Sequence, residues 1–310
     1  MFTRERLAGA ARVACLFMCV AGLAACGAIK TAAIKNVADT LAQPGDTITS
    51  HDVPDVVRDG LAFPLIMYES LLVSIPKHET LLVATCKGYT SYAFAFVESD
   101  ADLLREEENH DKVTALRADA VKLYLRAKEY CMRAIDVRFP GLSQPLVNDP
   151  VPALKRAKDK HDVELLYWTA ASWGAAMALR KDPELVIDFP VVRALAERGL
   201  ELDETWSGGA LHELMITLDA QGEIFGGSED GARRHYAKAV EIQQGLMAGP
   251  HVALAMGVAL PKGDRAEFEA LIQKALDVDP EKRRSERLVN LITQKRAKAL
   301  QARLDELFPK

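Results

Sequence analysis

The sequence has little that would mark a nucleic-acid-binding or membrane-spanning protein. Its formal net charge is −5 over 310 residues, and it has no basic run of the kind that follows a phosphate backbone. A nearly uncharged stretch, Glu164 to Leu179, is shorter than the ~20 residues that cross a bilayer. Apolar residues make up 49% of the chain and charged residues 27%, which favours a folded protein with a sizeable core.

Motifs that would indicate an enzyme are also missing. The sequence contains no Cys-x-x-Cys pair and no Gly-x-Ser-x-Gly turn that would expose a serine nucleophile. His212-Glu213 begins like a zinc-protease motif, but Ile216 stands where the second histidine belongs. The acidic residues between Asp100 and Asp111 are typical of a solvated connector rather than of acid–base catalysis. We therefore expect no catalytic residue, no metal and no cofactor.

Two glycine pairs, Gly208-Gly209 and Gly226-Gly227, each precede an expected helix. Backbone amides at a helix N-terminus bind phosphate well. However, neither pair is followed by the Lys-Ser/Thr of a P-loop, and tight turns between helices need glycine in any case. We interpret both pairs as turns.

The amino-terminus has the features of a bacterial lipoprotein signal. Arg4, Arg6 and Arg12 give it a positive start, and the apolar run Val13 to Leu23 is too short to span a membrane. The run ends in Leu23-Ala24-Ala25-Cys26, which resembles the lipobox of lipoproteins, in which the cysteine is lipidated and becomes the new first residue. The alternative is an ordinary secretory signal with a coincidental cysteine.

The lipobox implies a division of the chain into three parts. Residues 1–25 form the signal peptide, residues 26–50 the lipidated N-terminus and tether, and residues 51–310 a single α-helical domain. Gly27 rather than Asp follows the cysteine, which by the sorting rule for such lipoproteins favours the outer membrane over the inner one, facing the periplasm.

Cys86 and Cys131 remain in the mature chain beside Cys26. An oxidising periplasm would allow them to pair. Both lie in apolar helical patterns, where a cysteine behaves as a small buried hydrophobic residue. We expect buried free thiols, with a disulfide as the alternative.

Hydrophobic periodicity and turn residues predict helices along the whole mature chain. No run of alternating β-branched residues bounded by turns indicates a strand. Glu164–Leu179 is apolar nearly all round, with large residues interleaved with small ones, and is expected to be a buried central helix. The expected helices span residues 54–74, 79–98, 112–137, 161–180, 189–202, 208–220, 229–246, 250–259, 264–277 and 284–307.

A quartet of small, apolar, acidic and apolar residues recurs at helix ends. Copies beginning at Gly199, Ala239 and Ala275 are 40 and 36 residues apart, and another copy begins at Ala134. Tetratricopeptide repeats, which are antiparallel helix pairs, have a period of 34 residues. The fold class we expect is therefore all-α, a right-handed stack of antiparallel helix pairs in degenerate tetratricopeptide-like repeats.

Aromatic residues gather on the helices expected at the middle of the stack. They pack a core, or their hydroxyls and ring edges line a cleft for a ligand. The sequence leaves both interpretations open. The candidate cleft residues are Tyr89, Tyr92, Phe96, Tyr124, Tyr167, Trp168 and Trp173.

The order and spacing of several short motifs resemble the TatT family, lipoproteins associated with tripartite ATP-independent periplasmic (TRAP) transporters. The motifs span nearly the whole mature chain. They are the lipobox at Cys26, Leu123-Tyr124-Leu125-Arg126-Ala127, Phe139-Pro140-Gly141, Leu166-Tyr167-Trp168, Gly208-Gly209-Ala210-Leu211-His212, His235-Tyr236-Ala237-Lys238-Ala239 and Arg287-Leu288-Val289-Asn290.

The resemblance implies an all-α homotrimer with cryptic tetratricopeptide-like repeats and no enzymatic role. Its implied partner is a periplasmic solute-binding protein of a TRAP-type transporter, with which it shares a hydrophobic or organic-acid ligand. Only Cys26 carries over from the family as a functional residue. The alternative is a free-standing lipoprotein that carries an apolar ligand without a transporter partner.

Overall fold

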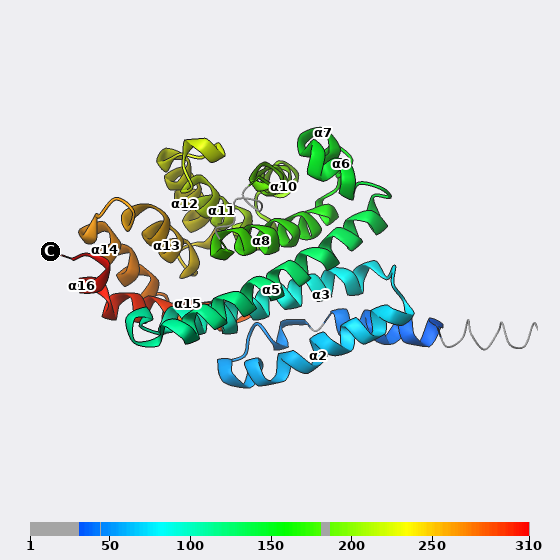
Figure 1. Ribbon diagram of the computed structural model, residues 1–310, viewed down its shortest axis with the longest axis horizontal. Coiled ribbons are helices and arrows are strands. Elements are labelled where there is room, and N and C mark those ends of the chain that lie inside the picture. Colours follow the sequence, from blue (N-terminus) through cyan, green and yellow to red (C-terminus); the bar gives the residue numbers. More distant parts are fainter. Residues whose placement is uncertain (1–30, 44, 181–186, 310) are drawn as a thin grey trace, which may run out of the picture.

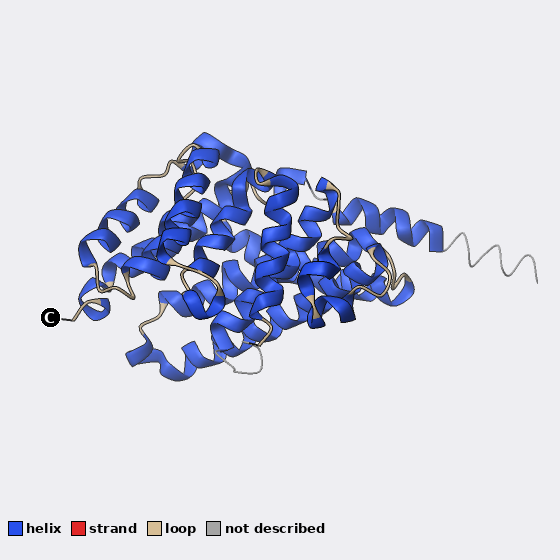
Figure 2. Ribbon diagram, turned by 90° about the horizontal axis from the view of Figure 1, so that it is seen from above, coloured by secondary structure: helices blue, strands red, loops and turns tan. Residues whose placement is uncertain are grey.

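The computed structural model describes residues 31–43, 45–180 and 187–309, and every regular element in those ranges is helical (Figure 2). The all-α fold class is therefore confirmed. Both ends of most expected helices lie within a few residues of the observed ends. The elements are η1 Gly45–Thr47, α2 Pro54–Ser74, α3 Glu79–Tyr92, η2 Ala93–Glu98, α4 Ser99–Leu103, α5 Glu106–Arg138, α6 Ser143–Asn148, α7 Pro150–Leu154, η3 Lys160–Asp162, α8 Val163–Arg180, α10 Phe189–Asp203, α11 Trp206–Asp219, η4 Glu223–Phe225, α12 Glu229–Gln243, α13 Gly249–Leu254, η5 Ala255–Ala259, α14 Arg265–Leu276, η6 Pro280–Glu286, α15 Arg287–Ala302 and α16 Leu304–Leu307.

Helix α8 occupies the centre of the molecule, as its composition predicts. It lies between α5 on one side and α10 on the other, and it also contacts α3 and α11 (Figure 1). Trp173 is 1% exposed and fills space beside small residues such as Ala170. A Cβ atom at Gly174 would lie 3.3 Å from Val192 Cγ1, so the missing side chain allows α10 to approach closely.

The expectation of an acidic connector at Asp100–Asp111 is wrong, because most of this stretch is helical. Residues Ser99–Leu103 form α4, and α5 starts at Glu106. Asp100 accepts a hydrogen bond of 2.7 Å from Arg58, and Asp102 accepts one of 2.6 Å from Arg296. These carboxylates have partners far away in the sequence, which local composition cannot reveal.

The expected tether contains structure as well. Residues 31–42 are helical, and Ala38 is completely buried against the core. Tyr68 on α2 donates a hydrogen bond of 2.6 Å to the Leu41 carbonyl, and Asp39 lies 3.2 Å from His78. A helix this short gives weak periodicity, so its docking depends on contacts with α2 and α3. The expected signal peptide and Cys26 lie outside the described residues.

Cys86 and Cys131 form a disulfide, so the expectation of free thiols is wrong. Cys86 lies on α3 and Cys131 on α5, and the two helices pack against each other along much of their length. Their Cα atoms are 5.4 Å apart, within the normal range for a disulfide. Apolar surroundings are equally compatible with a bridge, because a disulfide has no charge to solvate.

The small residue of each repeated quartet is buried at a helix contact. Ala134, Ala239 and Ala275 have no exposed surface, and Gly199 is buried where a Cβ atom would lie 3.0 Å from Leu211 of α11. The quartets thus mark close approaches between helices. A right-handed tetratricopeptide-like stack remains a prediction.

The last long helix returns to the amino-terminal part of the domain. Helix α15 contacts α4 and α2. The Leu288 amide donates a hydrogen bond of 2.9 Å to the Thr49 carbonyl, and Arg287 donates one of 3.0 Å to Ser50. The two ends of the domain therefore brace each other. Among the described residues, no helix combines the length and the hydrophobicity needed to cross a bilayer.

Candidate functional site

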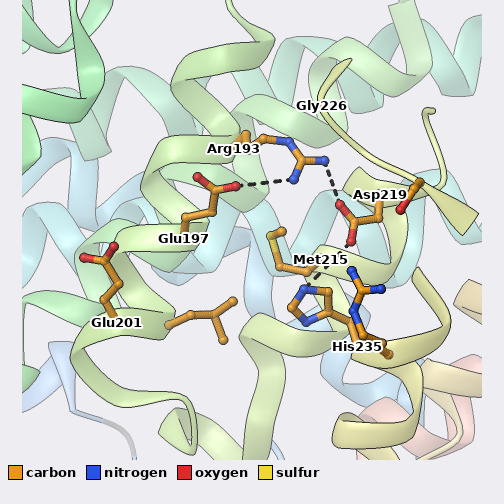
Figure 3. Close-up of a pocket in the computed structure, with 10 residues that line it drawn as sticks. Arg193, Glu197, Glu201, Met215, Asp219, Gly226 and His235 are labelled. Atoms are coloured by element: carbon orange, nitrogen blue, oxygen red, sulfur yellow. Dashed lines mark hydrogen bonds and ion pairs between the residues drawn. The ribbon is translucent and has the colours of Figure 1, made fainter. Parts of the chain in front are cut away.

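A pocket of about 390 Å³ opens between α10, α11 and α12 (Figure 3). Its lining is mostly polar and charged, with Leu200 and Met215 as apolar exceptions. The polar lining consists of Arg193, Glu197, Glu201, Asp219, Gly226, Ser228, Arg234 and His235.

A buried ion pair forms the wall of the pocket. Arg193 of α10 donates a hydrogen bond of 2.8 Å to Asp219 at the end of α11, and their side chains are 13% and 7% exposed. Arg193 also donates to the Phe225 carbonyl at 2.9 Å and contacts Glu197 at 3.4 Å. Because the guanidinium has three partners in fixed positions, it holds α10, α11 and the η4 turn together.

Glycines allow the α11–α12 turn to close around Asp219. A Cβ atom at Gly227 would overlap the Asp219 backbone, and one at Gly231 would overlap its carboxylate. Gly226 has a φ of +73°, a conformation that favours glycine. Ser228 caps α12, and its hydroxyl oxygen accepts a hydrogen bond from the Gly231 amide. The interpretation of Gly226-Gly227 as a turn therefore fits this geometry.

A histidine pair lies at the edge of the same pocket. Nδ1 of His212 lies 2.8 Å from Nδ1 of His235, so one imidazole donates and the other accepts. Nε2 of His235 lies 3.8 Å from Asp219, and Nε2 of His212 lies 3.6 Å from Glu204. Burial lowers the pKa of both histidines, and the neighbouring His212 lowers the pKa of His235 further. Both imidazoles are therefore neutral near pH 7.

The charges of the pocket suit a polar macromolecular contact better than a single small anion. Arg193 is neutralised internally by Asp219, while Glu197 and Glu201 remain exposed on the rim beside Arg234. Within the described part of the chain, no group of three or more His, Cys, Asp or Glu side chains is placed to hold a metal ion.

The predicted aromatic residues lie elsewhere. Tyr89, Phe96, Tyr124 and Trp173 are buried, and Tyr92, Tyr167 and Trp168 are half-buried. None of the seven lines the pocket in Figure 3. The structure brings Tyr92 and Phe96 together, with ring centroids 5.5 Å apart, and places Tyr167 against Trp168 at 4.9 Å. Their role in binding a ligand remains a prediction.

Sequence reasoning missed the residues that do line the pocket. Arg193, Asp219 and His235 come from three helices, and each looks in the sequence like an ordinary surface charge of an amphipathic helix. A weak signal was present at Gly227 and Gly231, because two glycines flanking a helix start indicate a close approach of backbone to a neighbouring group. Nothing in the spacing identifies that group as Asp219.

Comparison with known proteins gives a family match over the whole helical part of the chain. A model of the TRAP transporter T-component family matches residues 50–308, which include every element from α2 to α16 and all pocket residues. An uncharacterized protein of Treponema pallidum (strain Nichols) is 28% identical over 265 residues. The alignment covers 84% of this chain and 82% of that protein.

Proposed function

Because the chain belongs to the TRAP transporter T-component family, we propose that it is a lipid-anchored periplasmic accessory protein that docks the solute-binding protein of a TRAP-type transporter. The observation that carries this proposal is the family match over residues 50–308, which confirms the resemblance drawn from the sequence. In this proposal the protein also helps to bind or pass on a small organic or hydrophobic ligand. It acts as a homotrimer and not as an enzyme.

The anchoring part of the proposal rests on the lipobox at Cys26. Lipidation there attaches the protein to the membrane, and Gly27 favours the outer membrane. Cys26→Ser is expected to leave the fold intact and to move the protein from the membrane fraction to the soluble or uncleaved pool. Membrane retention of this variant in the mature, cleaved form would contradict a lipid anchor.

The docking part of the proposal is supported by the rim of the pocket. Glu197, Glu201 and Arg234 present charges on a surface whose underlying Arg193–Asp219 pair is fixed. Charged groups around an interface steer association and select the partner. We place the contact with the solute-binding protein at this rim, opposite basic groups of the partner.

In-cell crosslinking of the tagged, lipidated protein tests docking directly. The expected result is stoichiometric capture of a periplasmic solute-binding protein, identified by mass spectrometry. Reversing the two acidic rim charges, with Glu197→Arg and Glu201→Arg, is expected to reduce this capture at least tenfold. Glu129→Arg, an exposed charge reversal on α5, is the matched control and should capture normally. Capture of only the protein itself by the wild type would remove the transporter link.

The alternative function is that of a free-standing carrier of an apolar ligand. The observation that favours it is the contact of half-buried aromatic rings at Tyr167 and Trp168. Native mass spectrometry of the purified protein would reveal a co-purifying ligand. Neighbouring reading frames that encode a solute-binding protein and a permease would favour the transporter accessory over the carrier.

A further inference from the structure

Three aromatic rings meet at the junction of α8 and α11. The centroid of Tyr167 lies 4.9 Å from the centroid of Trp168 and 4.9 Å from that of Trp206. All three side chains are half-buried, so solvent reaches them. The backbone directly after Trp206 is strained, since Ser207 has a φ of 47° and is followed by two glycines in the same left-handed region. Such strain is commonly retained where a ring must be held in one position for binding.

The carboxylate of Glu213 lies near the Tyr167 ring, and no basic side chain among the described residues is paired with it. Glu213 lies on α11 after the left-handed segment Ser207–Gly209, which separates it from Trp206. Its carboxylate packs against the α13 backbone, because a Cβ atom at Gly249 would overlap it. Burial raises the pKa of Glu213 to about 7, a hydrogen bond from Gln243 lowers it, and the charge of Glu286 raises it again. None of these influences is a cation.

In the described part of the chain, two buried polar atoms of these residues and their neighbours have no hydrogen-bond partner. They are the Oε1 acceptor of Gln243 and the Nε1 donor of Trp168. Gln243 is only 3% exposed, so its orphaned oxygen costs free energy unless a ligand satisfies it. An acceptor beside an unpaired carboxylate calls for a positively charged donor.

Two basic groups, Lys87 and Arg283, lie near these rings, and neither acts on Glu213. Lys87 lies 3.6 Å from Glu164 and 5.7 Å from the centre of the Trp168 ring. Arg283 and Lys87 both lower the pKa of Glu286, which burial raises. The unmet negative charge is therefore that of Glu213.

We propose that the interior cluster of Tyr167, Trp168, Trp206, Glu213 and Gln243 binds a small protonated amine. The ammonium group donates hydrogen bonds to Glu213 and to Gln243 Oε1, and its cationic end lies against the aromatic faces. Trp168 Nε1 donates to an acceptor elsewhere on the same ligand. This assignment replaces the organic acid of the sequence prediction by an organic cation. It rests on the ligand-binding part of the proposed function and not on docking.

Three probes of similar size show whether the charge of the ligand or its hydrophobicity determines binding. n-Butylamine, butanoate and 1-butanol are titrated into the full-length protein in a non-ionic detergent at pH 8, with tryptophan fluorescence and thermal unfolding as readouts. A ligand of this size binds at about 1 mM when well matched, and titration to tenfold above that covers the range. We expect butylamine to bind at least tenfold more tightly than the other two probes.

The variant Glu213→Gln keeps the shape of the side chain and removes its charge. It is expected to weaken butylamine binding at least tenfold, whereas Glu129→Gln, which removes an exposed carboxylate on α5, should change the affinity less than twofold. Failure of butylamine to saturate, tighter binding of butanoate, or an unchanged affinity in Glu213→Gln would each overturn the proposal.

The pH dependence gives an independent readout. Butylamine stays protonated throughout, while Glu213, whose pKa is about 7, gains charge between pH 6 and 8. Tyr167 faces Glu213 and stays neutral, because burial raises its pKa. Affinity should therefore rise across this range in the wild type and stay flat in Glu213→Gln. The same variant should still capture the solute-binding protein in cells, so failure of amine binding is distinguishable from failure of docking.

Discussion

Nδ1 of His212 lies 2.8 Å from Nδ1 of His235, and each ring has a carboxylate near its other nitrogen. The contact survives one added proton, because a donor and an acceptor remain. A second proton puts two donors against each other in a buried place. The pair is therefore a structural contact of the neutral state, and acid should weaken it.

This contact predicts acid sensitivity of the fold. Burial lowers the pKa of both histidines from 6.5, so the unfolded chain binds more protons than the folded one as pH falls below that value. The contribution of the two histidines to stability should be constant above about pH 7 and should fall towards pH 5. Thermal unfolding at a series of pH values measures this. His235→Gln should flatten the slope, while His110→Gln, an exposed histidine, should leave it unchanged; equal slopes in all three proteins would contradict the prediction.

The disulfide between Cys86 and Cys131 should stabilise the domain substantially. It closes a loop with a sequence separation of 45, for which chain entropy gives about 4 kcal/mol. The double variant with both cysteines replaced by Ala should lose about 2–4 kcal/mol of its free energy of unfolding, measured in urea. Wild-type protein whose disulfide has been reduced should show the same loss. If Cys86 and Cys131 both react with a thiol reagent when the protein is unfolded without a reducing agent, the bridge is absent.

How far the sequence could predict the structure depends on how local each feature is. The bounds of α2 follow from Pro54 and the Ile75-Pro76 stop, and the burial of α8 follows from its composition. The disulfide could not be predicted, because it requires the rotation of α3 about its axis to match that of α5. The pocket could not be predicted either, because Arg193 and Asp219 meet only after three helices have packed.

The Arg193–Asp219 pair predicts that a substitution of equal shape at Asp219 will strongly reduce the stability of the fold. Asp219→Asn preserves the shape but removes the buried counter-charge of Arg193 and leaves only the exposed Glu197 beside its guanidinium, which should destabilise the fold by about 3 kcal/mol. Glu197→Gln is the control, since Glu197 is 50% exposed and contacts the same arginine. An exposed pair contributes at most about 1 kcal/mol. Equal losses in the two variants, measured by urea unfolding, would refute this account of the pocket wall.

The two α8 tryptophans should respond differently to truncation. Trp173 is 1% exposed, with Lys128 Nζ 3.4 Å from the centre of its ring, so Trp173→Ala should cost about 3–5 kcal/mol. Trp168 is half-buried, and Trp168→Ala should cost about half as much. Chemical unfolding of both variants measures the difference. If Trp168→Ala is as damaging as Trp173→Ala, Trp168 is a core residue and not a ligand contact.

The ionisation of Glu213 should change the stability with pH in the opposite direction to the histidines. Its pKa is raised by burial from 4.5 to about 7, so the folded state binds more protons than the unfolded state between these values. The stabilising effect of the bound proton is complete below pH 4.5 and is lost as pH rises through 7. Glu213→Gln removes the ionisation, and its amide gains Gln243 Oε1 as an acceptor. At pH 8 the variant should therefore be more stable than the wild type by about 3 kcal/mol.

At pH 5 the two proteins should differ by less than about 1 kcal/mol, because Glu213 is protonated in the folded state and this pH lies only just above the unfolded pKa of 4.5. Urea unfolding at both pH values provides the measurement, and Glu129→Gln on the exposed side of α5 provides a matched control. A variant that is less stable than the wild type at pH 8 would show that the Glu213 charge is already compensated within the protein. In that case the buried carboxylate would have no unmet charge to offer to an amine.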